Sequence, residues 1–211
     1  MGRSIGGEVI RPIKNALDDM PIHVRQLGDM IRKHRAQQRR NHDGVDDVDR
    51  FDSTVTTRGA NTKTTLWDTE SRRPIAEHGH IGEDFGSSTR GDNATDIGNL
   101  GEATDDGGHL GAHRFYGDTP DVGIVPQASN LNRGAWKKME NEWADWSGQG
   151  YHVDYEVDVL PPGSVRPDRF EVSYTVTDPA TGDVVRDHST SFNNAAGELF
   201  DRIPRADIPK R

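Results

Sequence analysis

The chain has 211 residues, no cysteine and a formal net charge of −9. This length suits one domain with a real core and an appendage, and the lack of thiols excludes a disulfide framework, a thiolate zinc site and a cysteine nucleophile. The acidic surplus argues against a protein that holds nucleic acid by bulk electrostatics alone, because Lys and Arg supply most non-specific affinity for phosphate.

The first fifty residues predict a helical segment followed by a linker. Apolar residues recur three or four positions apart over Ile10–Ile31, interrupted by Pro21, so we expect two short helices rather than one long one. Their shared face fits ordinary packing, or docking onto an upstream segment of a longer protein, better than a dedicated oligomer contact. A basic stretch, 32–40, gives way to a polar linker. We therefore predict an N-terminal helical segment and linker over 1–50 and a main domain over 51–211.

The main domain is expected to begin with three short strands, over 53–57, 64–69 and 74–78, separated by turn-forming residues. The next segment, 83–101, is rich in Gly, Asp and Asn and predicts a long loop. Structureless loops of more than about 12 to 15 residues are uncommon in compact domains, so a functional or mobile loop is expected here.

A helix and a strand meander follow. Trp136, Met139, Trp143 and Trp146 recur three or four positions apart and predict one buried helix face. Asn132 stands where the N-cap of that helix belongs, and the Gly-Gln-Gly run from residue 148 ends it. Apolar alternation then predicts three antiparallel strands, over 151–159, over 170–176 and up to about residue 192.

Several separated motifs occur in a fixed order within the main domain. They are Asp106-Gly107-Gly108-His109, Pro126-Gln127, Asn132-Arg133-Gly134-Ala135-Trp136 and Glu140. Together they resemble the DNA/RNA non-specific endonucleases, a ββα-metal finger family, over roughly residues 60–195. The Gly-Gly-His-Leu form and the Asn-Leu-Asn-Arg-Gly run are most similar to the toxin modules of bacterial polymorphic toxins.

This resemblance implies an α+β fold in which a ββα-metal finger packs on an antiparallel sheet. It implies metal-dependent, sequence-tolerant hydrolysis of DNA or RNA, with Mg²⁺ as the cofactor and Mn²⁺ as a substitute. For a toxin it also implies a cognate immunity protein as partner and delivery into a target cell. The chain has no apolar stretch approaching the roughly 20 residues of a membrane span, and its start lacks the apolar run of a signal peptide, so we expect a soluble protein.

Phosphodiester hydrolysis needs a base for water and a cation for the developing negative charge. His109 suits the base, since imidazole titrates near neutrality. Asn132 suits a hard cation such as Mg²⁺, which prefers oxygen ligands. Glu140 lies eight residues further on, about two helical turns, so it returns to nearly the same face and can hold the metal or its waters. Candidate phosphate contacts are Arg133, Lys137 and Lys138.

Two glycines depart from the better-known family pattern. Gly107 stands where Asp-Arg-Gly-His members carry Arg, and Gly123 stands nine residues before Asn132, where many relatives carry Asn. A transition-state arginine must therefore come from elsewhere in the chain, and Arg90 is the candidate.

Two other functions stay open at this point. The two departures would fit a nuclease-fold module that binds nucleic acid or an immunity protein without turnover. A zinc hydrolase would instead use His78, His80, His109 or His113 as ligands. Otherwise, His113 is expected to be a pocket-wall or a packing residue.

Overall fold

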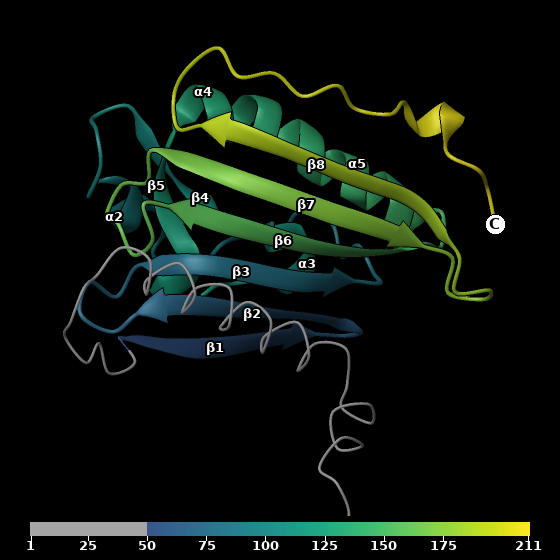
Figure 1. Cartoon of the computed structure of the whole chain (residues 1–211), viewed down its shortest axis with the longest axis horizontal. Helices are drawn as coiled ribbons and strands as arrows, with labels where there is room; N and C mark the ends of the chain where they lie inside the picture. Colours follow the sequence, from purple (N-terminus) through teal and green to yellow (C-terminus); the bar gives the residue numbers. More distant parts are fainter. Residues whose placement is uncertain (1–49) are drawn as a thin grey trace, which may run out of the picture. The chain divides into compact units, whose positions relative to one another are not determined.

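A six-stranded antiparallel sheet is the framework of residues 50–211, the part of the chain that the computed structural model describes (Figure 1). The predicted N-terminal helical segment and linker fall on residues 1–49, outside this range, apart from residue 50. In spatial order the strands are β1 (Phe51–Arg58), β2 (Asn61–Asp68), β3 (Pro74–Ile81), β6 (His152–Leu160), β7 (Arg169–Thr177) and β8 (Val184–Asn193). All five pairings are antiparallel.

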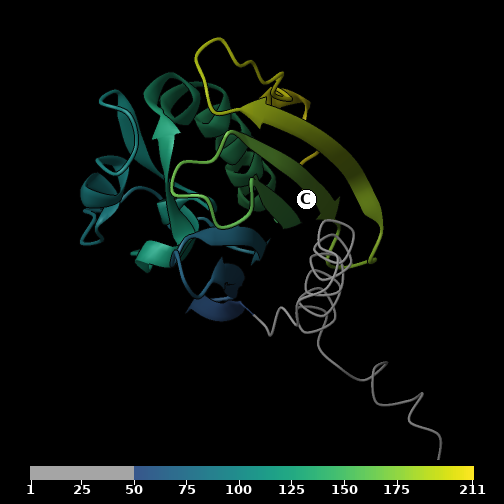
Figure 2. The ribbon, with the colours of Figure 1, turned by 60° about the vertical axis from the view of Figure 1, so that its left-hand side comes forward.

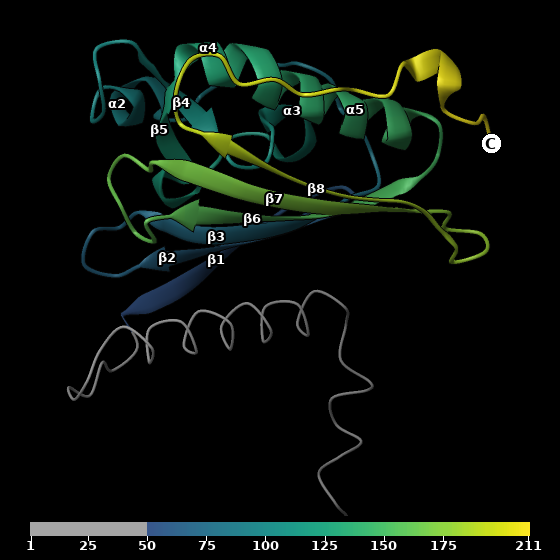
Figure 3. The same cartoon turned by 45° about the horizontal axis from the view of Figure 1, so that its top comes forward.

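One face of this sheet carries a smaller ββα unit. It consists of a two-stranded sheet, β4 (Asp105–His109) with β5 (Ile124–Ala128), and a helical stretch that ends with α5 (Lys137–Gly148). Figure 3 shows the large sheet close to edge-on, with β4, β5, α5 and the short helix α3 (His113–Tyr116) on the same side. The expected α+β architecture, a ββα finger on an antiparallel sheet, is confirmed.

The core lies between α5 and the large sheet. Trp136 and Trp143 are fully buried on the inner face of the helical stretch. The Trp143 ring stacks on Tyr155 of β6, with ring centroids 4.7 Å apart, while Val153 and Val157 flank Tyr155 on the same strand face. The inward-facing residues of β6 and the tryptophans, spaced three or four positions apart, therefore pack against each other in one apolar layer.

The six strands of the large sheet agree with the sequence-based expectations, each within a few residues, whereas β4 and β5 were expected only as part of the finger that the family resemblance implies. The segment 83–101 differs, because it contains a short helix, α2 (Ala94–Gly98). Only two apolar residues, Ala94 and Ile97, are buried there along with Gly98, too few to give a periodic pattern. Tertiary packing forms this helix: a Cβ on Gly98 would come within 2.5 Å of the Gly107 nitrogen on β4.

The helical stretch begins earlier than expected. It starts with α4 (Ser129–Leu131), continues through a π-helical turn (Asn132–Trp136) and runs into α5. Asn132 has helical dihedrals, φ −55° and ψ −49°, so the prediction that it is the N-cap is wrong. Single π-turns inside helices occur frequently at functional sites.

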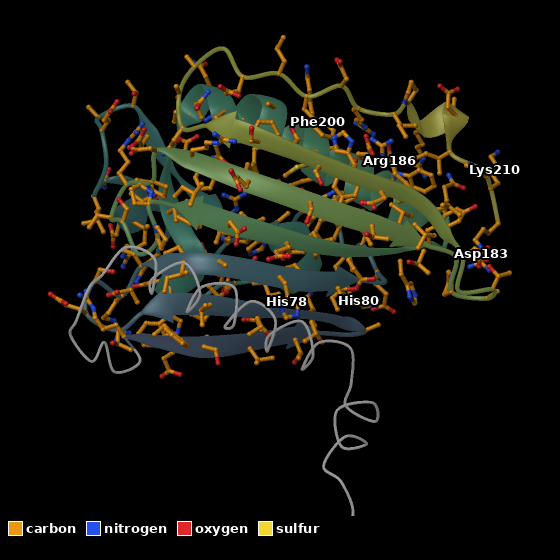
Figure 4. All side chains as sticks on the ribbon, in the orientation of Figure 1. His78, His80, Asp183, Arg186, Phe200 and Lys210 are labelled. Atoms are coloured by element: carbon orange, nitrogen blue, oxygen red, sulfur yellow. The ribbon has the colours of Figure 1, made fainter. Side chains whose placement is uncertain are left out.

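The segment after β8 runs back along α5 (Figures 1 and 2). The fully buried Glu142 of α5 holds it there, accepting the Ile203 backbone N–H at 2.8 Å and the Tyr174 hydroxyl at 2.6 Å. Arg186 of β8 pairs with the same carboxylate at 2.9 Å. Figure 4 labels Arg186 together with Phe200, a buried residue of the C-terminal segment. The C-terminal segment is thus part of the folded unit. Within residues 50–211 no helix combines the length and hydropathy that a membrane span requires.

Candidate active site

A partly open pocket of about 410 Å³ lies where β4 meets the helical stretch and the loop before α2. It brings together the three residues proposed for catalysis and metal binding, His109, Asn132 and Glu140, which are up to 31 positions apart in the sequence. Four further expected residues also line it: Arg90, His113, Arg133 and Lys137. Lys138 is exposed and is not among the lining residues.

His109 is the last residue of β4, and its side chain is only 4% exposed. Its Nε2 lies 2.7 Å from Oδ2 of Asp92, whose side chain is 3% exposed. Burial lowers the pKa of His109 below its usual value, and the charges of Lys63 and Arg90 act in the same direction, against Asp92. The imidazole is therefore neutral at working pH, as a general base must be.

Asp92 was missed by sequence reasoning. It lies in the Gly-, Asp- and Asn-rich segment, where nothing in the local pattern distinguishes it from the neighbouring Asp84 and Asp96. Its importance comes from a contact with a residue 17 positions away. No periodicity or capping motif carries that information.

Asn132 is oriented by Asp106, the first residue of the Asp-Gly-Gly-His motif. Its Nδ2 donates to Asp106 Oδ2 at 3.1 Å, which directs the amide oxygen away from that carboxylate. Asp106 also pairs with both Nε and Nη2 of Arg133, at 2.7 Å and 2.5 Å. Hydrogen bonds from Arg133 chiefly, and from Asn132, hold the pKa of Asp106 below its usual range. Arg133 therefore helps to fix the Asp106 carboxylate, which in turn orients the Asn132 amide.

Glu140 lies on the pocket wall, partly buried, two helical turns beyond Asn132. Burial raises the pKa of its carboxyl to about 8, against the opposing effects of the Trp136 indole and of nearby cationic side chains, Arg90, Arg114 and Lys63. Burial therefore outweighs the charges of these side chains. A cation bound in the pocket would further favour the ionised carboxylate.

The donor set fits a hard divalent cation. An amide oxygen and a carboxylate on one pocket wall are the ligand types that Mg²⁺ prefers, and this ion needs only one or two protein anchors. A second group, Asp92, His113 and Asp118, places potential ligand atoms within 4.8 Å of one another. There, however, His113 Nε2 already lies 3.0 Å from Asp118 Oδ1, and Asp92 is hydrogen-bonded to His109. We assign this second group to a hydrogen-bond network rather than to a metal.

The two departures from the family pattern have structural causes. A Cβ on Gly107 would overlap the Ala94 carbonyl group of α2, so an arginine cannot stand there without moving that helix. A Cβ on Gly123 would lie 2.7 Å from Thr119 Cγ2 and 3.4 Å from Glu77 Oε2, so the space of a side chain is already occupied. Beneath it, the fully buried Lys63 and Glu77 pair at 3.3 Å.

His78 and His80 both lie on β3, as Figure 4 shows, and neither lines the pocket. Because strand residues alternate between faces, they point away from the face of Glu77, which contacts Tyr155 in the core. His80 Nδ1 pairs with Asp154 of β6 at 2.8 Å. The four histidines of the zinc hypothesis therefore do not converge.

Two solved structures of NucA from Streptococcus agalactiae are similar to this chain. The one with no metal bound shares 14% sequence identity, with 66% of this chain and 73% of that chain covered and a TM-score of 0.48. The one with a magnesium ion bound shares 13%, with 70% and 84% covered and a TM-score of 0.47. The model of the DNA/RNA non-specific endonuclease family matches residues 61–178, more than half of the chain. On this match the chain belongs to the DNA/RNA non-specific endonuclease family.

Proposed function

We propose that the protein is a metal-dependent endonuclease that hydrolyses phosphodiester bonds of DNA, RNA or both with little regard to sequence. The observation that carries this proposal is the convergence of His109, Asn132 and Glu140 on one pocket that solvent can enter. An imidazole, an amide oxygen and a carboxylate on the walls of one pocket supply both functions that the reaction needs, a base and a cation anchor.

In this mechanism His109 takes a proton from the attacking water, the water oxygen forms the new bond to phosphorus, and the bond from phosphorus to the leaving oxygen breaks. Asn132 and Glu140 would hold the cation, Mg²⁺ or in its place Mn²⁺. When bound, that ion would stabilise the negative charge that develops on the phosphate oxygens and on the leaving oxygen. Arg90 lines the pocket and is close enough for its charge to act on both His109 and Glu140, which suits a role in stabilising the transition state.

Substrate binding is assigned to the basic residues of the helical stretch. Lys137 lines the pocket and suits the phosphate next to the scissile bond. Lys138 and Arg133 are exposed and suit flanking phosphates, although Arg133 must share its guanidinium with Asp106. Few phosphate contacts on an acidic protein predict weak binding, which favours movement between substrates, and each contact that is made adds to the salt dependence of the affinity.

We further propose that the chain acts as a bacterial toxin module that is delivered into a target cell and neutralised by a cognate immunity protein. The support is the Gly-Gly-His-Leu form of the motif and the Asn-Leu-Asn-Arg-Gly run. Co-purification of this chain with the product of an adjacent small reading frame, and loss of cleavage in that complex, would test the partner directly.

The enzymatic proposal is tested by plasmid nicking with Mg²⁺, with Mn²⁺ and with chelator. Wild-type protein should nick only when a divalent ion is present. His109→Ala should reduce the rate by about 10²- to 10⁴-fold with an unchanged circular dichroism spectrum. A folded wild-type protein that never cleaves DNA or RNA would favour the binding module without turnover. Cleavage that requires zinc and is lost in His78→Ala would favour the zinc hydrolase.

A further inference from the structure

The segment that contains Asp92 is held against the loop after α3 by two reciprocal hydrogen bonds. The Gly91 backbone N–H donates to Asp118 Oδ1 at 2.8 Å, and the Thr119 backbone N–H donates to Asp92 Oδ2 at 3.2 Å. Asp118 Oδ1 also faces His113 Nε2 at 3.0 Å. Each acidic residue therefore fixes the loop of the other, and Asp92 is presented to His109 in one position.

Asp92 is a carboxylate under these conditions. Burial opposes its ionisation, but the hydrogen bonds from His109 and from the Thr119 N–H lower the pKa of Asp92 to about 2. An ionised carboxylate can only accept hydrogen bonds. The 2.7 Å contact therefore requires that Nε2 of His109 carry the hydrogen, which makes Nδ1 the basic nitrogen of the neutral ring.

We propose that Asp92 is a positioning residue that holds His109 in the Nε2–H tautomer and in one ring orientation, so that Nδ1 accepts the proton of the attacking water. This rests on the proposed function, in which His109 is the general base. In the proton transfer the water O–H bond breaks and an Nδ1–H bond forms. The Nε2 hydrogen stays on the ring, so the resulting imidazolium remains bonded to Asp92, which is not itself protonated.

The geometry allows charge and orientation to be separated by mutation. Asp92 Oδ2 receives two hydrogens, one from Thr119 and one from His109. An Asn at this position can keep an oxygen there for both donors, so Asp92→Asn removes the charge but retains the tautomer. Asp92→Ala removes both. We expect kcat to fall by about 10- to 10²-fold for Asp92→Asn and by about 10²- to 10⁴-fold for Asp92→Ala.

The pH profile separates positioning from a merely structural role. Cleavage should rise with pH as His109 becomes neutral, with Lys63, Arg90, Asp92 and the His113 ring, 5.9 Å away, as the groups that face it. Because Asp92 favours the charged ring, Asp92→Asn should move this limb of the profile to lower pH. A lower rate with the limb at its wild-type pH would overturn the proposal. Asp96→Asn, which removes an exposed charge four residues away and outside the pocket, should keep the wild-type rate and limb.

A measurement independent of cleavage is nuclear magnetic resonance of the full chain with ¹⁵N-labelled histidine, where the His109 signals are assigned by their loss in His109→Gln. The neutral ring should show a protonated Nε2 in the wild type and in Asp92→Asn, and a mixture of tautomers in Asp92→Ala. A wild-type ring protonated at Nδ1 would overturn the proposal even if no variant folds. Full cleavage by His109→Ala would instead overturn the base assignment and leave the tautomer result standing.

Discussion

Gly107 and Ala94 pack so closely that a Cβ on residue 107 would overlap the Ala94 carbonyl group. This contact joins α2 to β4, the strand that ends at His109. It explains why the motif is Asp-Gly-Gly-His in this chain, since the arginine of other family members would need the space that α2 fills. We propose that Arg90, four residues before Ala94, supplies the charge of such an arginine.

Gly107→Ala should therefore destabilise the protein. The added methyl meets backbone rather than a flexible side chain, so we expect the free energy of unfolding to fall by about 1 to 3 kcal/mol or more. Urea denaturation followed by fluorescence would measure it. Gly134→Ala is the matched control, because a Cβ there meets nothing within 4 Å and Ala is the better helix former. Equal stability of the two variants would contradict the packing argument.

Glu140→Gln should stabilise the metal-free protein at pH 8. The folded pKa of about 8 exceeds the ordinary value of 4.5, so the contribution of this carboxyl to stability is fully present below pH 4.5 and is lost as the pH rises toward 8. Part of the side chain faces the pocket, so we expect a gain on the order of 2 kcal/mol rather than the full shift. Thermal or urea unfolding between pH 5 and 8 would follow it, with the exposed Glu70→Gln as control.

The same substitution should reduce function. With one carboxylate ligand lost, added Mg²⁺ should stabilise Glu140→Gln less than the wild type, and cleavage should fall. A variant that is more stable and equally active would argue against Glu140 as a metal ligand.

Asp106→Ala should weaken Mg²⁺ binding without removing a metal ligand. The Asn132 amide would lose the acceptor that orients it, and such supporting contacts are typically worth 10- to 100-fold in metal affinity. Cleavage should recover partly at high Mg²⁺ concentration. Calorimetric titration with Mg²⁺ gives the affinity, and Asp121→Ala, a charge loss outside the pocket, serves as comparison. An unchanged Mg²⁺ affinity in Asp106→Ala would remove the orienting role.

Lys137→Gln should raise KM on DNA more than Lys138→Gln does, because only Lys137 lines the pocket. Both should reduce the salt dependence, since each phosphate contact contributes to the slope of affinity against salt concentration. Measuring KM over a salt series from about 20 to 200 mM, where the screening length changes strongly, would test this. A flat wild-type response would count against binding through phosphate contacts.

Arg90→Ala should lower kcat far more than it raises KM if the guanidinium acts on the transition state. Arg90→Lys should recover part of the rate, because the charge returns without the forked geometry of the guanidinium. Steady-state kinetics on a short duplex would separate the two constants. An effect on KM alone would make Arg90 a substrate-binding residue.

The amino-acid sequence by itself predicted the six strands of the large sheet and the tryptophan-lined helix, and its motifs, through their resemblance to the family, singled out His109, Asn132 and Glu140 as the candidate site. These features are local: alternation, helical spacing and short motifs depend on neighbours within about ten positions. Only the tertiary structure decided that Asp92 faces His109, that Asp106 binds Asn132 and engages Arg133, and that α2 fills the space beside Gly107. Those contacts join residues 13 to 27 positions apart. Which of the 35 Asp and Glu side chains faces His109 is decided by the path of the loops around the pocket.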